Sequence, residues 1–285
     1  MIYDRWSNNY PPYLIPIYQS YLNLKNLLNN NLSLLDEDEV HKIIPTPFKI
    51  NSNDGSLLIN DALQIYYSAD LKSEAKYLRE KLRQFTGRKF SILQKDYKGG
   101  KAIVLRTKPI SINKVSTEAY VLEISPDSGL IITGSDPAGV FYGIQSFIAL
   151  LPINVFQSPQ SSIEVSTVYI EDAPRFSYRG QHLDVCRNFF SKKQVYKLLD
   201  IMSFYKLNHL QLYLSEDEGW RIEIKELPEL TKVGGQRQHT SKEAAALHPS
   251  YGSGPNAYED NTFGSGFYSR EDFIDILQYA AERHI

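Results

Sequence analysis

From residue 43 onward, short apolar runs alternate with polar turns, as in a chain of β-strands and amphipathic helices. Ala75, Leu78, Leu82 and Phe85 form one helical stripe, with Ser73 as its expected N-cap and Gly87 as its expected end. A second helix is expected from about 138 to 151, before Pro152. Strand-like runs lie at 57–59, 63–68, 90–93, 102–106, 120–124, 130–133 and 163–170. Residues 43–172 are therefore expected to form an α+β domain, an antiparallel sheet with two helices on one face.

After a hinge at 171–174 the pattern changes to strand, helix, strand, long loop and helix. The strands are expected at 181–185 and 209–214, and a stripe that includes Val195, Leu199 and Met202 predicts the helix between them. Residues 269–272 read Ser-Arg-Glu-Asp, a capping box that opens the last helix. Such alternation predicts a parallel sheet with right-handed crossovers.

The first 42 residues differ from both parts, being rich in Asn, Leu and Tyr with an acidic patch at 36–39. They are expected to be a linker or the remnant of an upstream module. The predicted organisation is thus 1–42, then an α+β domain at 43–172, then a β/α domain at 173–285.

Composition narrows the possible functions. The chain has 42% apolar and 22% charged residues and a net charge of −2, which gives no electrostatic case for binding nucleic acid. No membrane span and no signal peptide are visible, so the compartment stays unknown. The single cysteine, Cys186, excludes an intrachain disulfide, and His182, His209 and His248 lack metal-ligand spacing. Neither a metal nor a cofactor is expected.

Arg187 is the first candidate for binding chemistry, because it directly follows the strand expected at 181–185. A guanidinium holds vicinal hydroxyls well, since its donors form a rigid fork. A salt bridge to Asp184 explains the residue equally well, and its position alone does not decide between the two.

Three acids, Glu216, Asp217 and Glu218, follow the next strand, where adjacent carboxylates must be solvated or paired. An acid–base pair of Asp217 with Glu218 is disfavoured, because neighbours on an extended segment point in opposite directions. Trp220 is expected to anchor the loop rather than to stack on a sugar. Arg221 is expected to pair with the acids before it.

The segments LDVCRNFF (183–190), SEDEGWRIEI (215–224) and LPELTKVGGQRQH (227–239) resemble family 20 glycoside hydrolases, the β-N-acetylhexosaminidases, especially chitobiases. DPAGVFYGIQS (136–146) resembles the end of that family's N-terminal domain. The resemblance implies removal of terminal β-linked N-acetylglucosamine or N-acetylgalactosamine with retention, the substrate's acetamido oxygen being the nucleophile. It also implies that Arg187 grips outer sugar hydroxyls. The residues implied to support it are Asp184, Glu216, Asp217, Trp220, Arg221 and His239.

The resemblance implies a (β/α)₈ barrel whose catalytic Asp-Glu pair follows the fourth strand. Residues 174–285 are fewer than the roughly 200 that such a barrel needs. The expectation is therefore a truncated TIM barrel without the catalytic pair, inactive by itself. The alternative is a non-catalytic carbohydrate-binding or scaffold protein derived from the family. Family members usually work in the periplasm, the lysosome or outside the cell.

Overall fold

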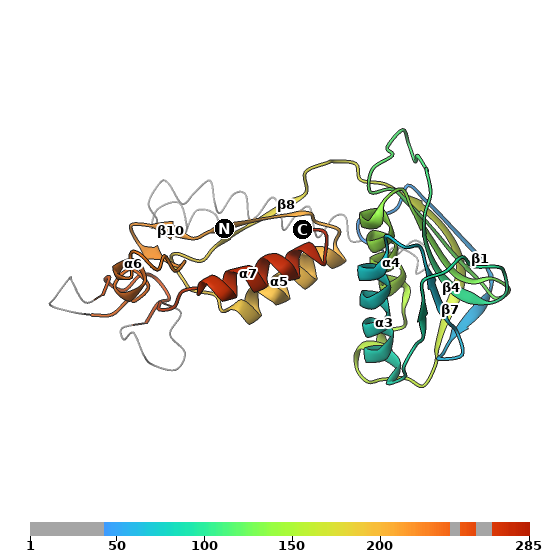
Figure 1. The fold of residues 1–285 in the computed structure, drawn as a ribbon, viewed down its shortest axis with the longest axis horizontal. Coiled ribbons are helices and arrows are strands. Elements are labelled where there is room, and N and C mark those ends of the chain that lie inside the picture. Colours follow the sequence, from blue (N-terminus) through green and yellow to red (C-terminus); the bar gives the residue numbers. More distant parts are fainter. Residues whose placement is uncertain (1–42, 240–245, 255–263) are drawn as a thin grey trace, which may run out of the picture. The chain divides into compact units, whose positions relative to one another are not determined.

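A seven-stranded sheet forms the first part of the computed structural model, which describes residues 43–239, 246–254 and 264–285 (Figure 1). These residues belong to one compact unit, Ile43–Ile285. The strand order is β1-β7-β5-β6-β4-β2-β3. The strands are β1 (Lys49–Ile59), β2 (Ile65–Tyr67), β3 (Ile92–Leu93), β4 (Ala102–Thr107), β5 (Tyr120–Ser125), β6 (Gly129–Gly134) and β7 (Ile163–Asp172).

The sheet is mixed, so the expectation of an antiparallel sheet is wrong. Strands β1, β7, β5 and β6 pair antiparallel, whereas β6, β4, β2 and β3 pair parallel. The reason lies in the connections. Helix α3 (Lys72–Thr86) follows β2 as a crossover, which returns the chain to the same end of the sheet. The expected hairpin between β5 and β6 is confirmed.

Two helices, α3 and α4 (Pro137–Leu150), lie side by side against one face of the sheet (Figure 1). The predicted stripe of α3 is buried, and Gly87 ends the helix in the left-handed region with φ of 68°. Leu71 rather than Ser73 is the N-cap of α3, because the helix begins one residue before Ser73. Helix α4 is capped by Asp136, whose Oδ1 accepts from the Gly139 N–H at 2.8 Å.

Substituting Gly129 should destabilise the sheet more than substituting Gly99. Both have φ near +100°, at +90° and +104°, so alanine strains the backbone at each. A Cβ at Gly129 would overlap the Ala102 carbonyl oxygen, whereas nothing lies within 4 Å at Gly99. We expect Gly129→Ala to lower the free energy of unfolding by about 2 kcal/mol more than Gly99→Ala. Urea denaturation followed by circular dichroism tests this, and equal midpoints would contradict the steric argument.

The second part begins with two parallel strands, β8 (Gly180–Asp184) and β9 (His209–Tyr213), which pair from Gly180 with His209 to Asp184 with Tyr213. Helix α5 (Lys192–Phe204) connects them, and α7 (Arg270–Ala281) packs beside α5 (Figure 1). The predicted capping box is confirmed, with the Asp272 N–H donating to Ser269 Oγ at 3.0 Å and the Ser269 N–H to Asp272 Oδ2 at 3.2 Å. A short hairpin, β10 (Ser215–Glu216) and β11 (Gly219–Trp220), follows β9, and α6 (Glu229–Lys232) comes after it.

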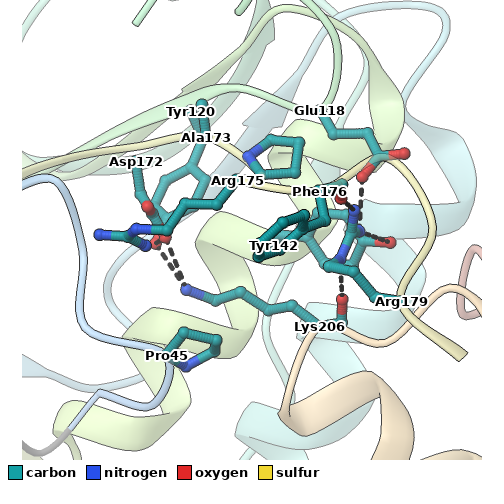
Figure 2. Close-up of a pocket in the computed structure, with 11 residues that line it drawn as sticks. Pro45, Glu118, Tyr120, Tyr142, Asp172, Ala173, Arg175, Phe176, Arg179 and Lys206 are labelled. Atoms are coloured by element: carbon teal, nitrogen blue, oxygen red, sulfur yellow. Dashed lines mark hydrogen bonds and ion pairs between the residues drawn. The ribbon is translucent and has the colours of Figure 1, made fainter. Parts of the chain in front are cut away.

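Buried polar contacts join the two parts, as Figure 2 shows. Lys206, just before β9, donates to Asp172 Oδ2 at 3.0 Å and to Tyr120 Oη at 2.9 Å. Arg179, just before β8, donates to Glu118 at 2.5 Å and to the Lys206 carbonyl at 2.7 Å. These contacts tie the starts of β8 and β9 to β5 and β7. In the part of the chain that the structure describes, we find no helix with the length and apolar character to span a bilayer.

Candidate functional site

Arg187 stands at the carboxyl end of β8, between carboxylates from two strands. Its Nη1 donates to Asp184 Oδ2 at 2.6 Å, and its Nε lies 2.6 Å from Glu216 Oε1. Asp184 ends β8 and Glu216 follows β9, so the parallel pairing of the strands brings both acids to one edge. Arg187 remains 45% exposed, and among the described residues its Nη2 has no hydrogen-bond partner. Donors of the fork thus face solvent.

Glu216 is the buried member of this group, with a side chain only 9% exposed. Its Oε1 forms a close ion pair with Arg187, but the N–H is not aligned as a hydrogen bond, and no other donor among the described residues reaches that oxygen. Burial raises the pKa of Glu216, and the Arg187 charge opposes this. For Asp184 burial acts in the same direction, yet hydrogen bonds from the Arg187 backbone and guanidinium hold its pKa below the usual range. The two acids therefore differ in proton affinity.

The three consecutive acids lie on a tight hairpin, so the expectation of an extended segment is wrong. Glu216 pairs with Gly219 across the hairpin, and Asp217 and Glu218 form its turn. Glu216 and Glu218 consequently lie on the same side, with Glu218 Oε2 4.0 Å from Arg187 Nε. Asp217 is exposed, and it forms no hydrogen bond or ion pair with the described residues. The contacts with Arg187 therefore come from Asp184, Glu216 and Glu218.

Glu218 connects Arg187 to a further loop, a role that the sequence did not reveal. Its Oε2 accepts from Ser250 Oγ at 3.0 Å and lies 3.4 Å from Arg237 Nη2. Asn188 Nδ2 donates to the Tyr251 carbonyl at 3.1 Å, which anchors the same loop. The sequence carried no clear signal for this contact, because Glu218 lies inside the two-residue turn and its partners Arg237 and Ser250 lie in distant loops.

Arg221 does not pair with the preceding acids, and that prediction is wrong. The side chain is fully buried, and its donors bind five backbone carbonyls: Val185 at 3.0 Å, Cys186 at 2.7 Å, Gly235 at 3.0 Å, Gly264 at 2.8 Å and Gly266 at 3.0 Å. Burial lowers the pKa of Arg221 to about 10, and the nearby Arg237 charge adds to this. Carbonyl oxygens reach the guanidinium because three loops converge on it. Arg221 therefore holds together the loops beneath Arg187.

The remaining predicted residues have structural or peripheral positions. Trp220 Nε1 donates to the Ile222 carbonyl at 2.7 Å, and the residue is half-buried. His239 is exposed at the edge of the described loop. Cys186 is buried, and burial raises the pKa of its thiol to about 11. Among the described residues, no group of histidine, cysteine or acidic side chains is arranged to hold a metal.

Comparisons with known proteins agree with this architecture. The model of glycosyl hydrolase family 20, domain 2, matches residues 40–173, and that of the family 20 catalytic domain matches residues 176–285. The chain belongs to glycosyl hydrolase family 20. The family consists of hexosaminidases, which act on carbohydrates containing N-acetylglucosamine.

Among family 20 relatives, N,N'-diacetylchitobiase of Vibrio harveyi is 35% identical over 272 residues, covering 93% of this chain and 28% of that protein. A β-hexosaminidase of Porphyromonas gingivalis is 36% identical over 251 residues, covering 87% of this chain and 30% of that protein. A Vibrio harveyi exo-β-N-acetylglucosaminidase crystallised with N-acetylglucosamine gives a TM-score of 0.70 at 28% identity, covering 86% of this chain and 35% of that one. The chain thus spans less than a third of the length of these two curated relatives.

Proposed function

We propose that this chain is the substrate-gripping first portion of a β-N-acetylhexosaminidase that removes terminal N-acetyl-hexosamines by a substrate-assisted, retaining mechanism. The observation that carries the proposal is the position of Arg187, held by Asp184 and Glu216 at the carboxyl ends of two parallel strands. In β/α barrels this end of the strands forms the active site. Membership of family 20 supports the substrate class.

In this proposal the Arg187 fork donates to a pair of vicinal hydroxyls of the terminal sugar. Asp184 and Glu216 fix the plane of the guanidinium, so little side-chain freedom is lost when the sugar binds. The buried Glu216 Oε1, which lacks an aligned donor among the described residues, can accept one of the same hydroxyls. Asp217, Trp220 and His239 belong to the surrounding loops rather than to the grip. The substrate's acetamido oxygen would attack the anomeric carbon, and Arg187 would not contact these reacting atoms.

The acid–base pair is proposed to lie outside these 285 residues, on later strands of the same barrel. The exposure of Gln181 and His182 on β8 and of His209 and Gln211 on β9 supports a sheet that continues beyond two strands. The chain alone should therefore not hydrolyse 4-nitrophenyl N-acetyl-β-glucosaminide above the buffer rate. Release of 4-nitrophenol in proportion to chain concentration, in preparations free of host hexosaminidase, would refute the proposed division of the site.

Arg187→Lys should lower kcat/KM for a terminal N-acetylglucosaminide about 100-fold in a polypeptide that continues this chain through a complete family 20 catalytic domain. Lysine keeps the charge but loses the fork that holds two hydroxyls and two carboxylates at once. Steady-state kinetics measure the effect, and the matched control is Arg88→Lys, at an exposed arginine outside the site. A decrease in kcat/KM of less than threefold for Arg187→Lys would mean that Arg187 does not bind the sugar hydroxyls as proposed.

A further inference from the structure

A cavity of about 190 Å³ lies at the junction of the two parts (Figure 2). It is built around Arg179, which directly precedes β8, and Lys206, three residues before the start of β9. Arg187 and Glu216 lie at the opposite ends of these strands, so the cavity is separate from the candidate site. Its apolar walls come from Pro45, Tyr142, Pro174 and Phe176. Phe176 is 74% exposed and therefore stands at the mouth.

One wall of the cavity is polar, and its hydrogen-bonding capacity is incompletely used. Asp172 and Lys206, whose side chains are 7% and 8% exposed, form the ion pair described above. Asp172 Oδ1 is buried, and no donor among the described residues reaches it. A buried carboxylate oxygen without a donor is costly, which makes it a place where a ligand hydroxyl would gain a strong hydrogen bond.

The cavity also has a spare positive charge at its mouth. Of its three cations, Lys206 is paired with Asp172 and Arg179 with Glu118. Arg175 is exposed, stacks over the Phe48 ring at 4.2 Å, and has no carboxylate partner among the described residues. The charges that line the cavity therefore favour an anionic group near Arg175 and a neutral hydroxyl near Asp172.

We propose that this junction cavity is a binding site for a small ring-bearing hydroxy acid. The hydroxyl donates to Asp172 Oδ1, the ring lies between Tyr142, Pro45 and Phe176, and the carboxylate faces Arg175. The size is suitable, because an apolar cavity of about 150 Å³ takes up benzene, and this cavity leaves room for two small substituents. A ligand here would join β7 to the start of β9, and so would fasten the two parts of the chain to each other.

The test uses the whole 285-residue chain and 4-hydroxybenzoate as the probe, followed by ¹⁵N-resolved NMR titration. We expect saturable shifts at the amides of Tyr142 and Ala173, with 4-methoxybenzoate and 4-hydroxybenzamide each binding about tenfold more weakly. The first analogue lacks the donor for Asp172, and the second lacks the charge for Arg175. No saturation at millimolar concentrations, or equal binding of all three probes, would overturn the proposal.

The matched variants are Arg175→Gln and Arg88→Gln, both at exposed arginines and neither in the candidate sugar site. We expect about tenfold weaker binding of 4-hydroxybenzoate in the first and no change in the second. Equal weakening in both would mean that the probe responds only to overall charge, and the site would be rejected. Because neither side chain is buried, loss of folding does not confuse the comparison, and superimposable thermal melts verify this.

Discussion

Replacing Arg221 with methionine is expected to lower the free energy of unfolding by more than about 4 kcal/mol. Five backbone carbonyls lose their donor together, and all five lie in or beside a closed interior where water does not substitute freely. Methionine fills the volume of the aliphatic stem but offers no hydrogen. The loops containing Gly235, Gly264 and Gly266 should separate from the end of β8. Arg187 and its carboxylate partners should then lose the structure that supports them.

Arg221→Lys distinguishes hydrogen bonding from charge. An ammonium has three donors rather than five and no planar fork, so we expect an intermediate loss of stability. Urea denaturation measures the free energies, and hydrogen exchange at Gly235 and Gly266 reports whether the loops open locally. Arg88→Met, at an exposed arginine, is the control. A change of less than about 1 kcal/mol for Arg221→Met would mean that the loops hold without the guanidinium.

The wrong partners predicted for Arg221 illustrate where sequence reasoning ends. Nearby acids made a local ion pair the simplest prediction, but the side chain points inward and binds carbonyls from Val185 and from Gly264, dozens of positions away in either direction. Backbone carbonyls carry no residue-type signal, so no pattern along the chain identifies them as partners.

Local features were predictable where their cause is local. The stripe of α3, its glycine end and the capping box of α7 follow from side chains a few positions apart. Strand direction in the first sheet was not recovered, although the order strand, helix, strand around α3 does indicate a parallel crossover. The burial pattern also carried a signal, because the parallel neighbours β4 and β6 are buried almost continuously whereas the antiparallel β5 alternates between buried and half-buried positions.

In the candidate site, the sequence located Arg187 and left open whether it pairs with Asp184 or holds a ligand. The structure contains the salt bridge and leaves other donors of the fork exposed, so the two roles are compatible. Glu218 was passed over because the acids were treated as an extended run. A hairpin of only two turn residues reverses that geometry, and Gly219 permits it by allowing close approach to Cys186.

Asp172 and Lys206 form a buried ion pair. Replacing either residue alone is expected to lower the free energy of unfolding by about 3–5 kcal/mol. Burial lowers the pKa of Lys206, and the Asp172 charge offsets this only in part, so the pair is held in place at an energetic cost. In Lys206→Met, the Asp172 carboxylate keeps Tyr120 as its remaining donor. In Asp172→Asn, the ammonium is left with a neutral partner. Either change should lower Tm by roughly 10 °C.

The double variant Asp172→Asn/Lys206→Met leaves no unpaired buried charge. Its free energy of unfolding should therefore fall by far less than the sum of the decreases in the two single variants. Calorimetry of the unsubstituted chain, the two single variants and the double variant gives the coupling free energy between Asp172 and Lys206. The control is the neighbouring exposed pair, Lys49 with Glu171 at 3.4 Å, where Lys49→Met should change stability by less than about 1 kcal/mol. Additive losses at Asp172 and Lys206 would mean that each contributes through its own contacts. Strong coupling would identify the pair as the main polar link between the seven-stranded sheet and the start of β9.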